Sequence, residues 1–212
     1  FGVTCIYPRS RVLDPERNES GLSRVNSIGS PSTTRLLVFG GPYSNLRATQ
    51  ALRAKAAELG CAPSEVICTG DVVAYCAEPE ETTQAIRDWG CHVIAGNCEE
   101  QLAAGAGDCG CGFEEGTACD LLAKGWYPFA NQRVSDPSRA WMRTLPANLA
   151  LQFAGAKFQV VHGGNDIINQ FIFASEKVTL AEELAKTDAD VVIAGHAGLP
   201  ESRMSSALSQ LW

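Results

Sequence analysis

The feature that most constrains the fold is an alternation of short apolar runs with segments of helical periodicity, which begins at Arg35. The run at 36–39 ends at Gly40-Gly41-Pro42, and apolar residues then recur at helical spacing as far as Gly60. Further strands are predicted at 66–69 and 92–95, with a helix at 81–89 between them. Continuous apolar runs are typical of strands buried on both faces, and strands that alternate with helices form parallel βαβ units. The sequence therefore predicts an α/β fold with a mainly parallel sheet.

The second half of the chain predicts a change of strand direction. Residues 97–145 are expected to form helices and loops, without a strand pattern. Two apolar runs at 149–153 and 157–161 are separated by Ala154-Gly155, which is typical of a hairpin. A last helix at about 180–186 precedes a strand at 191–194.

Residues 1–34 differ from the rest of the chain. They are rich in serine, proline and mixed charge and have no periodic apolar face. Such a composition predicts an extended N-terminal arm, with the globular domain at 35–212. We expect the domain to fold without the arm, which would lie on its own domain or dock onto a protein partner.

Charge and cysteine content exclude several classes of protein. The 17 lysines and arginines against 24 acidic residues give a net charge of −7, which argues against a nucleic-acid partner. No apolar run approaches the ~20 residues of a membrane span. Nine cysteines, an odd number, favour reduced thiols over a disulfide framework, and hence a reducing compartment such as the cytoplasm or an organelle matrix or stroma.

Residues that can bind ligands follow the ends of the predicted strands. The carboxyl edge of an open α/β sheet is where ligands bind, and neighbouring glycines let the backbone turn there. Any one such residue is typical of a hydrogen-bonded turn, but four at equivalent strand ends indicate a site. The four pairs are Gly70-Asp71, Gly96-Asn97, His162-Gly163 and Gly195-His196.

In order and spacing, these blocks resemble those of the calcineurin-like metallophosphoesterases. The resemblance extends over about residues 35–200. It implies a four-layer α/β/β/α sandwich with mixed sheets, two metal ions, and hydrolysis of a phosphate mono- or diester. It also implies two further strands after the last block, and the sequence ends at Trp212 where the first of them would begin. Either the given sequence is cut short there, or a partner covers the edge of the sheet. The blocks that carry the resemblance are Gly70-Asp71-Val72-Val73-Ala74-Tyr75, Gly96-Asn97-Cys98-Glu99, Val160-Val161-His162-Gly163 and Gly195-His196-Ala197-Gly198.

The resemblance is unequal at the two metals. At the first metal, the family's aspartate and two histidines correspond to Gly41, Tyr43 and Gly198. The ligands of the second metal are all present and correspond to Asp71, Asn97, His162 and His196.

Two oxygens and two imidazoles suit Mn²⁺, Fe²⁺ or Zn²⁺ better than Ca²⁺ or Mg²⁺. We therefore expect one divalent transition metal. The alternative is that the site holds water or nothing, and that its polar residues only hydrogen-bond the loops.

The cysteines leave several alternatives open. Cys98 takes the position of the family histidine that protonates the leaving group, where a thiol of pKa about 8.5 is a poor acid. Its alternatives are a soft metal ligand or a small residue that fills a tight turn. Cys109, Cys111 and Cys119 lack Cys-x-x-Cys spacing and are expected to be reduced thiols of an insertion loop rather than a metal cluster. His92 falls within a strand pattern and is not expected to be a ligand.

Two functions follow from these patterns. The first is a degenerate metallophosphoesterase that hydrolyses a small phosphoester slowly or binds a phosphate ligand. The second is a non-catalytic accessory or scaffold subunit of a larger assembly, such as an organellar one, docked through residues 1–34. Whether the chain is an enzyme is left open by the sequence.

Overall fold

The sheets are built from short strands separated by helices along the chain. The computed structural model describes residues 3–6, 26–27, 35–173 and 175–199. One sheet has the spatial order β1 (Val3–Ile6), β3 (Leu36–Phe39), β4 (Val66–Cys68) and β5 (His92–Val93). The other has the order β2 (Asn26–Ser27), β6 (Asn148–Phe153), β7 (Ala156–Val161) and β8 (Val191–Ile193).

Both sheets are mixed. Strands β3, β4 and β5 are parallel to one another, whereas β1 is antiparallel to β3. In the second sheet β6 and β7 form the predicted antiparallel hairpin, and β2 and β8 are parallel to their neighbours. Strand β5 ends at Val93, two residues earlier than predicted, and Ala95 N–H then donates to the carbonyl of Pro146, just before β6.

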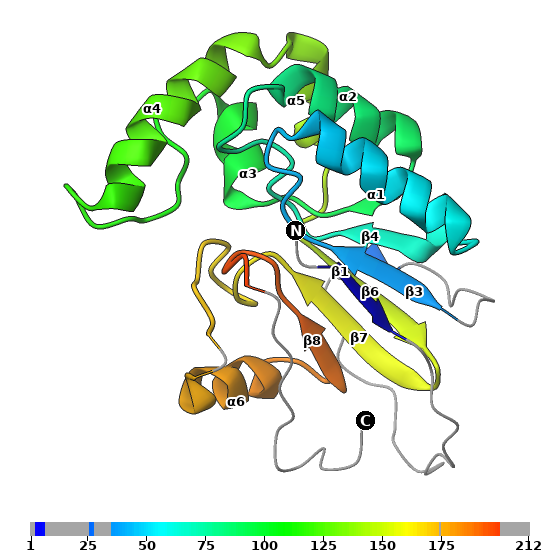
Figure 1. Ribbon diagram of the computed structural model, residues 1–212. Coiled ribbons are helices and arrows are strands. Elements are labelled where there is room, and N and C mark those ends of the chain that lie inside the picture. The colour runs from blue at the N-terminus through cyan, green and yellow to red at the C-terminus, as the bar shows by residue number, and fades with distance from the viewer. Residues whose placement is uncertain (1–2, 7–25, 28–34, 174, 200–212) are drawn as a thin grey trace.

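The helices cover the sheets from outside (Figure 1). Helices α1 to α5 lie on one side of the first sheet, and α6 contacts β8 of the second. Within the described residues, no helix is long and apolar enough to cross a bilayer. The helices are α1 (Leu46–Glu58), α2 (Pro79–Trp89), α3 (Asn97–Ala104), α4 (Ala118–Arg133), α5 (Asp136–Met142) and α6 (Lys177–Ala185), with a 3-10 turn, η1 (Pro63–Glu65).

Strand β3 shows why the sandwich has two apolar cores. All four of its residues are buried, and successive side chains point to opposite faces of the sheet. Leu37 and Phe39 belong to the core beneath the helices, where Phe39 stacks on Trp89 with ring centroids 5.5 Å apart. Leu36 and Val38 belong to the core between the two sheets. The four-layer α/β/β/α architecture is therefore confirmed.

The N-terminal residues contribute to both sheets. Val3–Ile6 pairs with Phe39–Leu36, and Asn26–Ser27 pairs with Leu149–Ala150. These six residues belong to the domain's own sheets, whereas the sequence predicted a domain that folds without them. The rest of the predicted arm, and residues 200–212, lie outside the described residues.

Candidate metal centre

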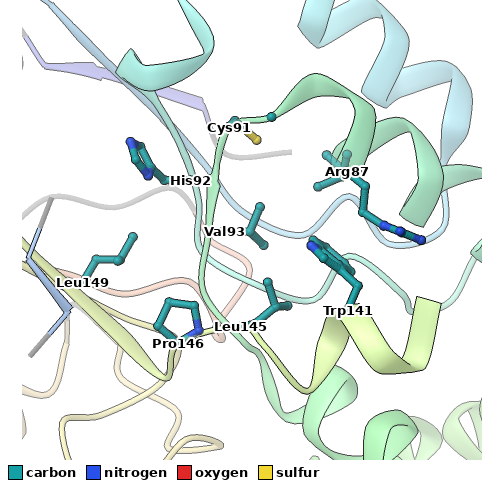
Figure 2. A pocket seen from close by; sticks show the side chains of 10 residues that line it. Arg87, Cys91, His92, Val93, Trp141, Leu145, Pro146 and Leu149 are labelled. Atoms are coloured by element: carbon teal, nitrogen blue, oxygen red, sulfur yellow. The ribbon is translucent and has the colours of Figure 1, made fainter. Parts of the chain in front are cut away.

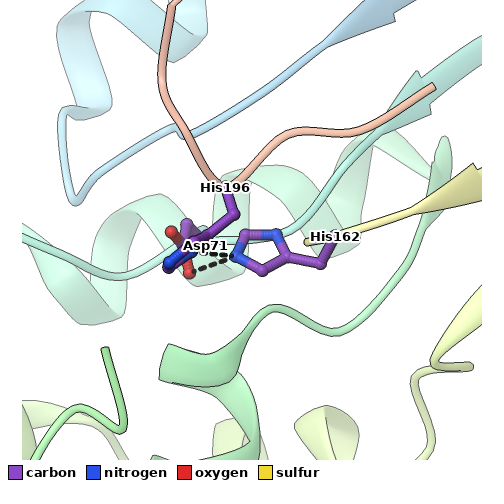
Figure 3. A group of neighbouring side chains, drawn as sticks. All are labelled: Asp71, His162 and His196. Carbon is purple, nitrogen blue, oxygen red and sulfur yellow. Dashed lines mark hydrogen bonds and ion pairs between the residues drawn. The ribbon is translucent and has the colours of Figure 1, made fainter. Parts of the chain in front are cut away.

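The predicted ligands meet at one end of the sandwich, between the two sheets. Asp71 follows β4, Asn97 is the first residue of α3, His162 follows β7 and His196 follows β8. All four side chains are buried. Figure 3 shows the carboxylate of Asp71 and the rings of His162 and His196 converging. The first sheet thus supplies the carboxylate and the second supplies both imidazoles.

The potential ligand atoms surround Nε2 of His162. That nitrogen lies 3.1 Å from Asn97 Oδ1, 3.1 Å from His196 Nδ1 and 3.4 Å from Asp71 Oδ1. Atoms bound to one tetrahedral metal at about 2.0–2.2 Å are roughly 3.3–3.6 Å apart, so the separations are close to those of a metal site. Among the described His, Cys, Asp and Glu side chains, only Asp71, His162 and His196 form a group that could hold a metal ion.

The surroundings of His162 fix which nitrogen carries its proton. Nδ1 lies 2.6 Å from the carbonyl oxygen of Thr69, which can only accept a hydrogen bond. Nδ1 therefore carries the proton, and in the neutral ring Nε2 presents a lone pair, as a metal ligand does. The ring of His196 is packed against Phe171, with centroids 4.3 Å apart.

Asn97 is oriented in the same way. Its Nδ2 group donates to the carbonyl of Cys109 at 2.7 Å and to Sγ of Cys111 at 3.2 Å, which turns Oδ1 toward His162. The side-chain oxygen Oδ1 of Asn97 and the carboxylate of Asp71 thus both face the lone pair on Nε2 of His162. Acceptors that face one another in a buried site repel unless a cation lies between them, so the cluster needs a metal ion or an additional proton.

The pKa values report this crowding. Burial alone would lower the pKa of His162, but the charge of Asp71 and the hydrogen bonds outweigh it and raise the pKa to about 9. For Asp71, burial acts to raise the pKa, and the charge and hydrogen bond of His162 bring it below its usual value. Burial and the charge of His162 lower the pKa of His196. Within the described residues, Nε2 of His196 has no hydrogen-bond partner and Oδ1 of Asp71 has only its 3.4 Å ion-pair contact with His162, which leaves both atoms available to a ligand.

Close approach of the loops depends on two glycines. A Cβ at Gly70 would lie 2.6 Å from the backbone nitrogen of Gly96 and 2.8 Å from Nδ1 of His162. A Cβ at Gly96 would lie 2.5 Å from Oδ1 of Asp71. Asp71 itself has a left-handed φ of 52°, a strained conformation for a residue with a side chain. Its carboxylate reaches the site because the surrounding loops hold that strain.

Glu99 holds the loops together, a role that the sequence analysis did not assign to it. Its buried carboxylate accepts hydrogen bonds from the backbone N–H groups of Asp71, Val73 and Gly96 at 2.8, 3.2 and 2.9 Å. Burial and the charge of Asp71 raise the pKa of Glu99 to about 7. The available signal was its position three residues after Gly96 at the start of a helix, where a glutamate reaches back to the N-cap.

The three positions that correspond to ligands of the family's first metal carry neither a carboxylate nor an imidazole. Gly41 and Gly198 have no side chain, and Tyr43 is half-buried with its ring 5.1 Å from that of Tyr75. Burial and the charge of Asp71 raise the pKa of the Tyr43 phenol, so it stays protonated.

The thiols lie beside the site without joining the metal-binding group. Cys98 is 1% exposed, and a hydrogen bond with Cys111, together with burial, raises its pKa well above the usual value. Cys109 and Cys111 are buried and Cys119 is exposed. Seven of the cysteines whose side chains are described are free thiols: Cys68, Cys76, Cys91, Cys98, Cys109, Cys111 and Cys119.

His92 lies elsewhere, on β5. It lines a pocket of about 280 Å³ with Arg87, Cys91, Trp141 and Leu145, shown in Figure 2. Neither Asp71, His162 nor His196 lines that pocket.

Comparisons with known proteins bear on the family. The chain resembles two solved structures in fold: the hypothetical protein PH1004 from Pyrococcus horikoshii OT3 and a metallophosphoesterase from Sphaerobacter thermophilus. The superposition on PH1004 has a TM-score of 0.63 at 18% sequence identity, and it covers 76% of this chain and 69% of PH1004. The second has a TM-score of 0.56 at 19% identity and covers 76% of this chain, which spans 59% of that protein's length. No curated protein matches significantly.

The family itself is shown by sequence. The family model of the calcineurin-like phosphoesterase superfamily domain matches residues 43–208, which is most of the chain. The match includes the loops that carry Asp71, Asn97, His162 and His196. The chain therefore belongs to the calcineurin-like phosphoesterase superfamily.

Proposed function

We propose that this protein is a phosphoesterase of reduced capacity, with one divalent transition metal held by Asp71, Asn97, His162 and His196. It would hydrolyse a small phosphoester slowly or bind a phosphate group. One observation carries the proposal: the oxygens of Asp71 and Asn97 and Nδ1 of His196 lie within 3.4 Å of Nε2 of His162. Crowded acceptors around a lone pair are a favourable environment for a cation.

The donor set fits Mn²⁺, Fe²⁺ or Zn²⁺, since it combines one carboxylate, one amide oxygen and two imidazoles. A metal ion bound there would supply Lewis-acid chemistry, which polarises a phosphoryl oxygen and lowers the pKa of water. Thr69 keeps the proton of His162 on Nδ1, so Nε2 is free to bind. Glu99 holds the backbone around Asp71 and Gly96 in place.

Two features of the chain support a low rate. Three groups of the family's first metal site are replaced by Gly41, Tyr43 and Gly198, and each lost transition-state contact costs several kcal/mol. Cys98, at the general-acid position, is buried and has a raised pKa, so it is a poor proton donor to a leaving group. Loss of general acid catalysis costs typically 10²–10⁴-fold. Phosphoesters whose leaving group needs no proton, such as nitrophenyl esters, should therefore be hydrolysed fastest.

Metal analysis beside hydrolysis assays tests the proposal. After loading with Mn²⁺ or Zn²⁺ and dialysis, we expect about one metal per chain by elemental analysis. Hydrolysis of bis-p-nitrophenyl phosphate and p-nitrophenyl phosphate should fall below the usual enzymatic range of about 1–10³ s⁻¹. The variant His162→Ala should lose the metal, and the matched control His92→Ala should keep it. Two metals per chain, none at any concentration, or ordinary enzymatic rates would contradict the proposal.

The seven free thiols support the further proposal that the protein works in a reducing compartment, the cytoplasm or an organelle matrix or stroma. A native-state thiol count in cell extract tests it.

A further inference from the structure

The phenol ring of Tyr43 lies where side chains at two neighbouring positions would otherwise lie. A Cβ at Gly41 would be 2.1 Å from Cζ and 2.3 and 2.5 Å from the two Cε atoms of the ring, distances at which atoms collide. At the same end of the ring, a Cβ at Gly198 would be 3.2 Å from the hydroxyl oxygen that Cζ carries. The hydroxyl end of the phenol therefore lies against both Gly41 and Gly198.

The backbone holds this ring in place. The N–H of Tyr43 donates to the carbonyl of Asp71 at 3.1 Å, and the carbonyl of Tyr43 accepts from Cys76 at 3.1 Å. Tyr43 has a left-handed φ of 51°, which a residue with a side chain adopts only under strain. Its ring packs edge to face against Tyr75. The loop that carries Tyr43 is thus joined to the loop that carries Asp71, and the ring has a defined place beside the candidate metal centre.

We propose that Tyr43 fills the half of the site in which related proteins hold their other metal, and that Gly41 and Gly198 make room for its ring. The proposal rests on the proposed function, because it explains why that site takes one metal. The three positions that lack the family's first-metal ligands, Gly41, Tyr43 and Gly198, then pack together as one unit, because any side chain at Gly41 would collide with the Tyr43 ring. A second cation is excluded by volume as well as by the absence of ligands.

A double-mutant cycle of thermal stability tests the packing. Gly60→Ala is the matched control, because Gly60 has a left-handed φ of 69° and no atom within 4 Å of its built Cβ. Backbone strain alone should lower its melting temperature by about 2–4 °C. Gly41→Ala should cost at least twice as much, because its Cβ also meets the ring. In a Tyr43→Ala background, the effect of Gly41→Ala should fall back to that of the control. Equal effects of Gly41→Ala in both backgrounds would overturn the proposal.

Cobalt binding tests exclusion by the ring. The double variant Gly41→Asp/Gly198→His restores two ligand groups and keeps the phenol, whereas adding Tyr43→Ala removes the ring without adding a ligand. Equilibrium dialysis with Co²⁺ should give one metal per chain for the double variant and a second metal once the ring is removed. The same count in both variants overturns the proposal.

The two measurements separate this proposal from the proposed function. A wild-type protein that binds no cobalt contradicts the metal centre but leaves the stability cycle informative, because the cycle needs no metal. The placement of Tyr43 is then supported if the changes in melting temperature caused by Gly41→Ala and Tyr43→Ala are not additive, and it is overturned if they are additive. Two cobalt ions in the wild type overturn the proposal directly.

Discussion

At the scale of single residues, the carboxylate of Glu99 connects the segments that carry Asp71 and Asn97. It is fully buried and accepts three backbone hydrogen bonds, two from the loop after β4 and one from the start of α3. Loss of a residue that positions metal ligands from outside the coordination shell typically lowers metal affinity roughly 10–100-fold. We therefore expect Glu99 to determine both stability and metal affinity.

Replacing Glu99 with glutamine tests this role. The amide keeps the shape of the side chain but has one acceptor oxygen, and its NH₂ group would face backbone N–H groups. Leaving buried donors unpaired costs about 1–3 kcal/mol, so the free energy of unfolding should fall by that amount in urea titrations. Zinc affinity should fall roughly 10–100-fold. The control is Glu100→Gln, at an exposed neighbouring position. If Glu99→Gln and Glu100→Gln change the free energy of unfolding and the zinc affinity equally, Glu99 does not position the metal ligands.

Positions of the candidate ligands could be predicted from the sequence, because residues after buried strands meet at one sheet edge. Asp71, Asn97, His162 and His196 do meet there in the structure. The place of the Tyr43 ring could not be predicted, since it depends on a left-handed φ and on open space over Gly41. The three hydrogen bonds of Glu99 likewise exist only after two distant loops have folded together.

At the scale of elements, one carboxylate joins α2 to the start of α5. Glu80 on α2 accepts hydrogen bonds from the N–H and hydroxyl of Ser135, the N-cap residue of α5, at 2.9 and 2.7 Å. It also accepts from the buried hydroxyl of Ser138 at 3.0 Å. Burial acts to raise the pKa of Glu80, but these hydrogen bonds outweigh it and lower the pKa. The helix layer is thus fastened by an ionised side chain.

This contact predicts a pH-dependent stability. A lowered folded-state pKa means that the carboxylate stabilises the fold above the usual glutamate pKa of about 4.3, and that the contribution is lost as the pH falls through the folded value. Glu80→Gln should therefore cost about 1 kcal/mol at pH 7, after allowance for solvent exposure, and less near pH 3.5. Urea unfolding at both pH values measures it, with exposed Glu81→Gln as the control. A cost that does not change with pH would contradict the interpretation.

Most elements could be predicted because their apolar patterns are long or continuous. Strands β3, β4, β6, β7 and β8 and helices α1, α2 and α6 lie within a few residues of their predicted places. Strands β1 and β2 could not be predicted, because they have only four and two residues and are defined by pairing with distant strands. Short strands of this kind owe their structure to the partner strand rather than to their own pattern.

At the scale of the whole molecule, one N-terminal stretch is attached to both sheets. β1 continues the first sheet beside β3, and β2 continues the second beside β6. The candidate metal centre also draws on both sheets, since Asp71 follows β4 and His162 follows β7. Changes in how the sheets are held together should therefore affect the site. These pairings favour an internal strap over a tether to a partner.

Replacing residues 3–6 with Gly-Ser-Gly-Ser separates the two roles of the N-terminal segment, because it removes strand β1 at constant chain length. Glycine and serine favour strands poorly, and β3 would lose the neighbour with which Val3–Ile6 pairs. If the segment is a strap, the melting temperature should fall by several degrees and hydrogen exchange at the β3 amides should become faster, while the assembly state stays unchanged. An unchanged melting temperature with loss of association to another protein would instead identify a tether and favour an accessory subunit. Calorimetry, hydrogen exchange and sedimentation of the wild-type protein and of the variant with residues 3–6 replaced distinguish these outcomes, because only a strap couples residues 3–6 to the stability of the sheet.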